Sequence, residues 1–273
     1  MPQVSTVSGR VATVTGAGSG IGRAVAAELA TRGCHLALVD LRKANLHATG
    51  RFLAPLGVRI SLHTVDVADP RQMESLPDAI MAEHPRLDIM INNAGVSLAG
   101  PFDSYHLDDL EWIIGVNLWG MLHGCRVVLP LMRRQGSGHI VNMSSDFGLI
   151  GLPSKTAYCA TKFAIRGFSE ALRAELADSG IRVTCVYPGA VDTNLIRTSR
   201  AADPTKRDRE AQFVAARATP VDAVARQIVR GIERGQARVL IGRDTFLIDA
   251  LTRLSPRLAN ALVTRLSKRL PFV

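Results

Sequence analysis

The sequence predicts an α/β protein built on a doubly wound, seven-stranded parallel sheet with helices on both faces. Two observations lead to this fold class. Seven short runs rich in Val and Ile alternate with longer segments whose apolar residues recur at helical spacing. The short runs are also almost continuously apolar, as expected for strands buried on both faces. Repeated strand–helix–strand order requires parallel strands with helices packed above and below them.

Each element can be placed along the chain from these patterns. Helices are expected at residues 21–32, 107–134 (with a bend near Pro130) and 157–178. Gly33 and Gly180 follow two of them, where a left-handed cap residue belongs. The expected strands are residues 11–15, 35–40, 58–67, 87–92, 139–143, 181–187 and 237–241.

Length and composition indicate one folded domain over residues 1–242, with a helical extension of the same domain over 243–273. The chain has 273 residues, of which 47% are hydrophobic and 21% charged, and this balance is ordinary for a soluble enzyme. No unbroken apolar run is long enough to span a bilayer. Residues 1–10 contain no apolar run, so we expect no secretory signal and a cytoplasmic location.

The net charge of +9 raises the question of nucleic-acid binding. The basic residues are scattered, with no basic stripe interleaved with aromatic residues, so we expect no nucleic-acid partner. The four cysteines are equally scattered and lack metal-ligand spacing. We therefore expect reduced, buried thiols and no metal site.

A glycine-rich turn, Thr-Gly-Ala-Gly-Ser-Gly-Ile-Gly, runs from Thr15 to Gly22 between the first strand and the first helix. Glycines let backbone N–H groups approach a pyrophosphate, and the helix N-terminus adds partial positive charge. Its G-x-x-x-G-x-G spacing differs from the G-x-G-x-x-G fingerprint. We expect cofactor contacts from Gly16, Gly18, Ser19, Gly20 and Ile21.

Asp40 ends the second strand, 20 residues after Gly20. A carboxylate there accepts hydrogen bonds from ribose hydroxyls and repels a 2′-phosphate, which favours NAD(H) over NADP(H). Arg42 and Lys43 follow closely and keep NADP(H) open as the alternative. The ends of the third and fourth strands should also contact the cofactor, through Asp66, Val67, Asn93, Ala94 and Gly95.

Tyr158 and Lys162 lie four residues apart on a predicted helix and so project from one face. A lysine ammonium favours the phenolate, and we expect it to lower the tyrosine pKa from its ordinary value near 10. The phenolate then takes an alcohol proton, or the phenol donates one to a carbonyl. Ser145, at the end of the fifth strand, is suited to holding the substrate oxygen. Asn117 interrupts an apolar helix, either as a satisfied structural amide or as the holder of a water linked to Lys162.

These motifs together resemble the short-chain dehydrogenase/reductase family over about residues 8–242. The resemblance implies a Rossmann-type fold, a catalytic set of Asn117, Ser145, Tyr158 and Lys162, and contacts of Tyr158 and Lys162 with the cofactor. It also implies assembly into dimers or tetramers through the helices at 107–134 and 157–178. The segment after the sixth strand is assigned to the nicotinamide ring, through Pro188, Gly189, Val191 and Thr193.

The substrate side of the predicted site is mainly apolar. Its candidate residues are Ser145, Phe147, Leu149, Leu152, Tyr158 and Tyr187. We expect a hydrophobic secondary alcohol, ketone or aldehyde, converted by an NAD-dependent dehydrogenase. The alternatives are an NADP(H)-dependent carbonyl reductase and a non-catalytic NAD-binding or sensing protein. Asp146 departs from the family pattern, which has a small or apolar residue after the serine.

Two segments break the strand–helix alternation. Residues 194–219 are polar and charged, and their place after a strand's carboxyl end suggests a lid over the ligand. The tail, residues 243–273, carries leucines at helical spacing with six basic and two acidic residues. Packing on its own domain is the favoured interpretation of the tail. Subunit contact ranks second, and contact with a membrane surface ranks third.

Overall fold

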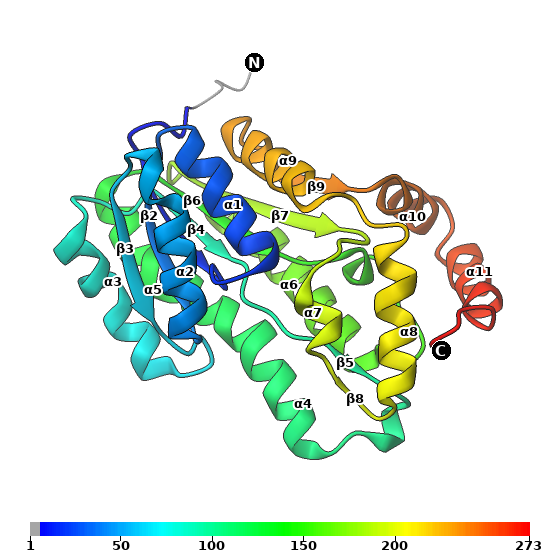
Figure 1. Cartoon of the computed structure of the whole chain (residues 1–273). Helices are drawn as coiled ribbons and strands as arrows, with labels where there is room; N and C mark the ends of the chain where they lie inside the picture. The colour runs from blue at the N-terminus through cyan, green and yellow to red at the C-terminus, as the bar shows by residue number, and fades with distance from the viewer. Residues whose placement is uncertain (1–5) are drawn as a thin grey trace.

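The computed structural model describes residues 6–273, which form a seven-stranded, entirely parallel sheet between two layers of helices (Figure 1). The strand order is β3-β2-β1-β4-β6-β7-β9. The order reverses direction between β1 and β4, which makes this pair the topological switch point where ligands bind in such sheets. The predicted fold class is confirmed.

Each of the seven apolar runs contains a strand. The largest difference concerns the run 58–67, of which only the middle is a strand. The strand ends at Thr64. The chain turns at Asp66, whose carboxylate Oδ1 accepts a hydrogen bond from the Ala68 N–H at 2.9 Å. The strands are β1 (Val11–Thr15), β2 (His35–Asp40), β3 (Ile60–Thr64), β4 (Ile89–Asn92), β6 (Gly138–Met143), β7 (Ile181–Pro188) and β9 (Arg238–Ile241).

Two hydrophobic layers hold the helices to the sheet (Figure 1). One face carries α1 (Gly20–Thr31), α2 (Lys43–Leu53) and α9 (Val221–Glu233). The other face carries α3 (Pro70–Glu83), α5 (Gly120–Gln135) and α6 (Thr156–Glu175). The α1 residues Val25 and Leu29 are fully buried, at the helical spacing that the sequence shows.

The helix predicted at 107–134 is divided by a change in helical pitch. It comprises α4 (Leu107–Ile114), the π-helical turn η3 (Gly115–Trp119) and α5, and Pro130 lies inside α5. By length and composition this run is apolar enough to cross a membrane. Its inner residues Met121, Val128 and Met132 belong to the buried core beside the sheet, so we interpret it as a core helix.

Residues 194–219 contain regular structure next to the sheet's carboxyl edge. The segment forms α7 (Asn194–Arg197), β8 (Arg200–Ala201) and α8 (Pro204–Ala215). Strand β8 pairs in parallel with β5 (Leu98–Ala99), so this segment is tied to the chain that follows β4. Short helical turns complete the fold, namely η1 (Ala54–Leu56), η2 (Phe102–Ser104) and η4 (Asp146–Gly148).

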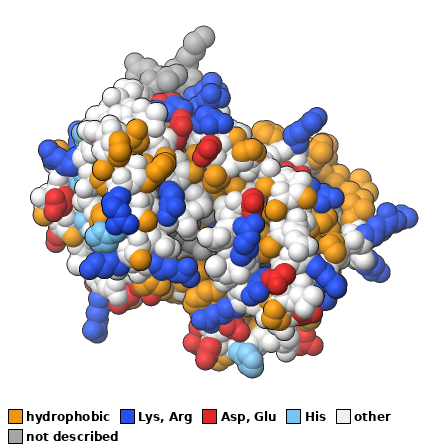
Figure 2. Space-filling view, in the orientation of Figure 1, with side chains coloured by type: hydrophobic (Ala, Val, Ile, Leu, Met, Phe, Trp, Pro, Cys, Tyr) orange, Lys and Arg blue, Asp and Glu red, His pale blue; other side chains and the backbone are white. Residues whose placement is uncertain are grey.

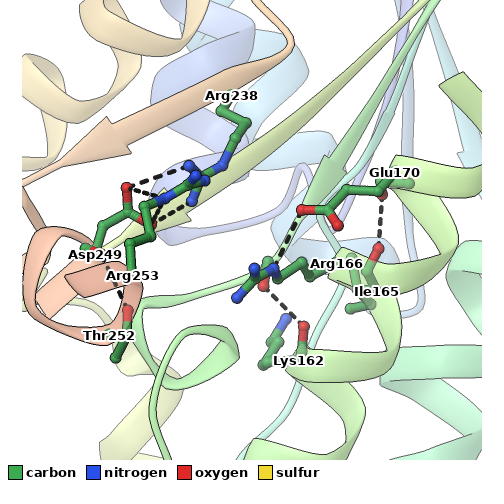
Figure 3. Close-up of polar contacts among 10 residues, drawn as sticks. Lys162, Ile165, Arg166, Glu170, Arg238, Asp249, Thr252 and Arg253 are labelled. Carbon is green, nitrogen blue, oxygen red and sulfur yellow. Dashed lines mark hydrogen bonds and ion pairs between the residues drawn. The ribbon is translucent and has the colours of Figure 1, made fainter. Parts of the chain in front are cut away.

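The tail forms two helices, α10 (Arg243–Leu254) and α11 (Pro256–Ser267), as its leucine spacing predicts. Helix α10 packs against β9 and η4. Figure 3 shows its anchor, Asp249, lying between Arg238 of β9 and Arg253. Hydrophobic side chains gather over the tail, with Lys and Arg at the rim (Figure 2). Those exposed on its two helices are Phe246, Leu247, Leu254, Leu258, Leu262 and Leu266.

The prediction that the chain has no secretory signal rests on residues 1–10, and residues 1–5 lie outside the described part. The cytoplasmic location stays a prediction. Each of the four cysteines lies in the described part, where it is a free and buried thiol. Within residues 6–273, no cluster of three or more His, Cys, Asp or Glu side chains is arranged to hold a metal ion.

The Asp249 anchor generates a stability prediction. Burial raises the pKa of Asp249, but its bonds to Arg238 and Arg253 outweigh burial and leave the pKa below the ordinary value. The stabilisation is therefore present above the unfolded-state pKa and is lost as pH falls through the folded-state pKa. At neutral pH, Asp249→Asn should cost about 2 kcal/mol and lower Tm by roughly 5 °C.

The measurement is thermal unfolding followed by circular dichroism at neutral and acidic pH. Asp178→Asn, at an exposed position, is the matched control and should leave Tm unchanged. The difference between Asp249→Asn and the parent should shrink at acidic pH. An equal Tm for all three proteins at neutral pH would contradict the anchoring role.

Candidate active site

A cavity of about 550 Å³ opens at the carboxyl edge of the sheet, beside the switch point between β1 and β4. It extends from the glycine turn to residues of the tail. Most of the predicted site residues line it, although they come from loops far apart in the sequence. These are Gly16, Ser19, Gly20, Ile21, Asp40, Asp66, Val67, Asn93, Ala94, Gly95, Ser145, Phe147, Leu152, Tyr158, Lys162, Pro188, Gly189, Val191 and Thr193.

The glycine turn has the geometry of a phosphate cradle. Gly16 and Gly20 have φ angles of 66° and 52°, in the left-handed region that favours glycine. A Cβ on Gly22 would lie only 2.2 Å from the carbonyl oxygen of Gly16. Within residues 6–273, no side chain caps the amino end of α1, and its first turn carries no acid. Its N–H groups therefore suit a phosphate, and the turn fits a dinucleotide.

Asp40 lines the cavity at the end of β2 with its carboxylate fixed from two sides. Its Oδ2 accepts a hydrogen bond from the Gly18 N–H at 2.8 Å, and its Oδ1 accepts one from the Arg42 N–H at 2.8 Å. A Cβ on Gly18 would lie 2.7 Å from Oδ2. Gly18 is not among the residues that line the cavity, although the sequence leads us to expect a cofactor contact from it. Its N–H points at the Asp40 carboxylate, and the absence of a Cβ lets the turn close onto that side chain.

A small hydrogen-bond network joins the glycine turn to the end of β4. The Thr15 hydroxyl accepts hydrogen bonds from the N–H groups of Asn93 and Ala94 at 2.9 and 3.0 Å. The Asn93 side-chain amide donates to the Thr15 carbonyl at 2.8 Å. The hydroxyl in turn donates to the Ile91 carbonyl at 3.3 Å. These bonds fix the two loops that flank the switch point.

Asn117 is not among the residues that line the cavity, although it lies behind Gly95, which does. Its Oδ1 accepts a hydrogen bond from the Val96 N–H at 2.8 Å, and its Nδ2 donates to the Val96 carbonyl at 3.0 Å and to the Thr161 hydroxyl at 3.2 Å. The amide is buried in the π-helical turn η3, where the altered pitch turns it towards these partners. These bonds satisfy the amide, and its second possible role, holding a water linked to Lys162, stays a prediction.

Tyr158 and Lys162 lie on α6 with both side chains in the cavity wall. The Lys162 ammonium donates to the Met143 carbonyl at 2.8 Å and lies 5.5 Å from the centre of the Tyr158 ring. Burial lowers the pKa of Lys162 to about 8. Burial, and then the charge of Asp146, raise the pKa of Tyr158 above its ordinary value. This is opposite to the lowering expected from Lys162, because the low-dielectric surroundings disfavour the phenolate. The chain alone therefore holds Tyr158 as a phenol.

Ser145 lies at the end of β6 and faces the same space as Tyr158. Its hydroxyl donates to Asp146 Oδ1 at 2.6 Å and accepts from the Phe147 N–H at 3.2 Å. The Phe147 ring packs edge-on against Tyr158, with 6.3 Å between ring centres. The predicted serine, tyrosine and lysine are thus gathered at one end of the cavity.

Two candidate substrate residues are core residues instead. Leu149 and Tyr187 are buried among the side chains between α5, α6 and the sheet. Tyr187 lies in a strand covered on both faces, and the Arg238 guanidinium stacks over its ring at 5.0 Å. An apolar residue has the same appearance in a sequence whether it lines a pocket or fills a core.

Several cavity residues were not predicted from the sequence. Two of them form a buried ion pair, in which the Lys155 ammonium lies 2.8 Å from the Glu210 carboxylate of α8. The ammonium also lies 3.3 Å from the Ser97 hydroxyl. Phe213 of α8 also packs against Phe272 of the tail, with 5.5 Å between ring centres. Helix α8 and the end of the tail therefore form one wall of the cavity. The remaining unpredicted lining residues include Trp112, Asp146, Leu195, Val214, Asp244 and Leu270.

Comparison with known proteins shows which family the chain belongs to. Residues 10–204 match the family of short chain dehydrogenases. This match covers more than half of the chain, so the chain belongs to that family of oxidoreductases.

One curated relative and two solved structures match the chain over nearly their whole length. The chain is 40% identical over 255 residues to SadH of Mycobacterium tuberculosis, an oxidoreductase by its name, covering 92% of each chain. A short chain dehydrogenase/reductase from Burkholderia phymatum, in complex with NAD, superposes with a TM-score of 0.87 at 29% identity, covering 93% of this chain and 96% of that one. A metagenomic short-chain oxidoreductase in complex with NADP superposes with a TM-score of 0.72 at 28% identity, covering 87% and 98%.

The Lys155–Glu210 pair generates a prediction about α8. Both side chains are nearly fully buried, so Glu210→Gln leaves a buried ammonium without its counter-charge. Local opening of α8 should become easier, and trypsin should cleave after Lys206, Arg207 or Arg209 at least about tenfold faster.

Limited proteolysis of the folded protein, with the cleavage sites read by mass spectrometry, makes this measurement. Glu74→Gln is the matched control, because Glu74 pairs with Arg126 at the exposed surface at 3.7 Å. Equal cleavage rates in α8 for the parent and Glu210→Gln would show that the buried pair does not hold the helix.

Proposed function

We propose that this protein is an NAD-dependent short-chain alcohol dehydrogenase or carbonyl reductase acting on a hydrophobic secondary alcohol, ketone or aldehyde. The observation that supports it most is that Ser145, Tyr158 and Lys162 lie close together in the wall of a cavity that the glycine turn also lines. A nicotinamide cofactor supplies or accepts the hydride when bound. A non-catalytic binding protein has no chemical need for a phenol and an ammonium next to a substrate space.

In the proposed reduction, Tyr158 acts as the general acid. Its raised pKa keeps the phenol protonated at neutral pH, ready to donate a proton to the carbonyl oxygen as hydride reaches the carbon. Ser145 holds the same oxygen. In oxidation the tyrosine oxygen takes the alcohol proton, which requires prior loss of its own proton. Lys162, in reach of the ring, offsets part of the phenolate charge and is placed to bind the nicotinamide ribose.

Asp40 supports NAD(H) as the cofactor. Its carboxylate is fixed by two backbone N–H groups at the cavity wall, where ribose hydroxyls can donate to its free lone pairs. A 2′-phosphate would be repelled by the same charge. Arg42 also lines this end of the cavity, so NADP(H) is the second candidate.

The apolar side chains around Tyr158 support a hydrophobic substrate. Phe147 packs against Tyr158, Trp112 belongs to the same apolar cluster, and Phe213 of α8 and Phe272 of the tail also line the cavity. We further propose a cytoplasmic protein that assembles as a homodimer or homotetramer. Large apolar side chains exposed on the run 107–135 and on α6 support assembly, among them Leu107, Ile114, Trp119 and Phe163.

Replacing Tyr158 separates catalysis from binding. Tyr158→Phe keeps the ring and its packing but removes the transferable proton. It should lower kcat by about a hundredfold or more and leave NADH affinity within about twofold of the parent. Steady-state kinetics with a panel of hydrophobic ketones and NADH titration by fluorescence provide the two readouts. Tyr105→Phe is the matched control and should retain activity, because Tyr105 is not among the residues that line the cavity and its hydroxyl bonds to the Ser154 carbonyl and the Thr156 side chain. Undiminished turnover by Tyr158→Phe would contradict the proposed role of Tyr158 as general acid and base.

Cofactor choice is tested at Asp40. The parent should bind NADH at least about tenfold more tightly than NADPH. Asp40→Asn keeps the shape but removes the charge, so this ratio should fall by roughly tenfold, mainly through tighter NADPH binding. Nicotinamide fluorescence titrations of both proteins measure the ratio, with Asp178→Asn as a surface control. A parent that prefers NADPH would show that Arg42 outweighs Asp40.

A further inference from the structure

Asp146 places a carboxyl group beside the proposed catalytic serine and tyrosine, and the proposed mechanism assigns no role to this group. It is the first residue of η4, directly after Ser145, and its partly buried side chain lines the cavity. Of the described residues, those that donate hydrogen bonds to it are Ser145 and Phe147. Its carboxylate therefore lies inside the site without a neutralising cation bonded to it.

The hydrogen bond between Ser145 and Asp146 determines what the serine offers a substrate. A hydroxyl has one proton, and Ser145 donates that proton to Asp146 Oδ1 at 2.6 Å. The Phe147 N–H donates to the same Oδ1 at 2.9 Å and fixes the carboxyl group in place. A substrate oxygen that approaches Ser145 then meets the lone pairs of the serine oxygen instead of its proton. A ketone oxygen carries no proton, so only hydrogen-bond donors can hold it. Ionised Asp146 engages the Ser145 hydroxyl and leaves the ketone oxygen with one donor, Tyr158, in place of two.

The same carboxyl group acts on Tyr158. Its negative charge disfavours a second negative charge on the phenol oxygen, in the same direction as burial. Burial, and the nearby Asp244, raise the pKa of Asp146 to about 6, so the group titrates close to neutrality. The titratable and charged groups that face Asp146 or its two targets are Asp244 of α10, Tyr158, Cys159 and Lys162 of α6, and Glu210 of α8.

We propose that Asp146 is a positioning residue that sets the pH dependence and the preferred direction of the reaction through Ser145 and Tyr158. Protonated Asp146 releases the serine proton for the substrate oxygen, and the carbonyl then has two donors. Ionised Asp146 accepts the hydrogen bond of the Ser145 hydroxyl, which is then not available to the substrate. Its charge also holds Tyr158 as a phenol, so alcohol oxidation requires a higher pH. The enzyme is thereby biased towards carbonyl reduction at mildly acidic pH. This inference rests on the proposed function.

The test compares the parent with Asp146→Asn and Asp146→Ala, the first removing the charge and the second also removing the acceptor. In the parent, kcat/KM for reduction of a hydrophobic ketone should fall about five- to tenfold as pH rises through the titration of Asp146. Both variants should lose this fall. The alkaline limb of alcohol oxidation should move to lower pH by roughly one unit in both. Asp178→Asn should keep the parental profiles.

A second readout needs no turnover. The phenolate of Tyr158 can be titrated by ultraviolet difference absorbance, with Tyr158→Phe subtracted to remove the other tyrosines. Its pKa should be lower in Asp146→Asn than in the parent by roughly one unit. Parental pH profiles and an unchanged Tyr158 titration in both variants would overturn the role of Asp146. An inactive parent with a shifted Tyr158 titration would instead refute the proposed function and leave the electrostatic coupling standing.

Discussion

The structure depends on the junction between the glycine turn and the end of β4, where one threonine hydroxyl receives two backbone N–H groups. Thr15 and Asn93 are far apart in the sequence, yet their hydrogen bonds close the point at which the strand order reverses. Without this junction, β1 and β4 would still pair, but the loops after them would be free to separate. The junction fixes the glycine turn on one side and the loop after β4 on the other, and residues of both loops line the cavity. The spacing between these two parts of the cavity wall is therefore fixed.

Charge in the cavity is arranged unevenly, and this arrangement gives the two ends different chemistry. At the glycine turn the protein offers N–H groups and one carboxylate held by backbone donors. Around Tyr158, Lys162 is a buried ammonium with a pKa lowered to about 8, while Asp146 and Glu210 bring negative charge near the phenol and Asp244 lies near Asp146. In these surroundings the phenol form of Tyr158 is favoured over the phenolate, so the side chain is held protonated. Asp146, which contributes to this, lies outside the set of residues that the family resemblance assigns to catalysis.

Much of the fold and site was predictable because the signals are local. The buried strands, the glycine turn and the Tyr158–Lys162 spacing each lie within a few residues of sequence, and the structure brings all three together. Other features depend on distant parts of the chain. The pairing of Lys155 with Glu210 joins residues whose spacing carries no signal, and Phe272 reaches the cavity only because α10 and α11 turn back towards α8. Leu149 and Tyr187 were assigned wrongly because burial in a core and exposure in a pocket require the same apolar side chains. The pKa of Tyr158 depends on burial, which spacing alone does not give.

The buried Lys155–Glu210 pair has a consequence for how substrate choice can change in this chain. Helix α8 lies in the segment after β7 and forms part of the cavity wall. An experiment that replaces this segment with the corresponding segment of a relative would exchange α8. One partner of the pair, however, lies three residues before Tyr158 and belongs to the flank of the catalytic helix. A transplanted segment without an acid in the right place would leave the buried Lys155 ammonium without its counter-charge. Exchange of this part of the cavity wall therefore has to be accompanied by a change at position 155.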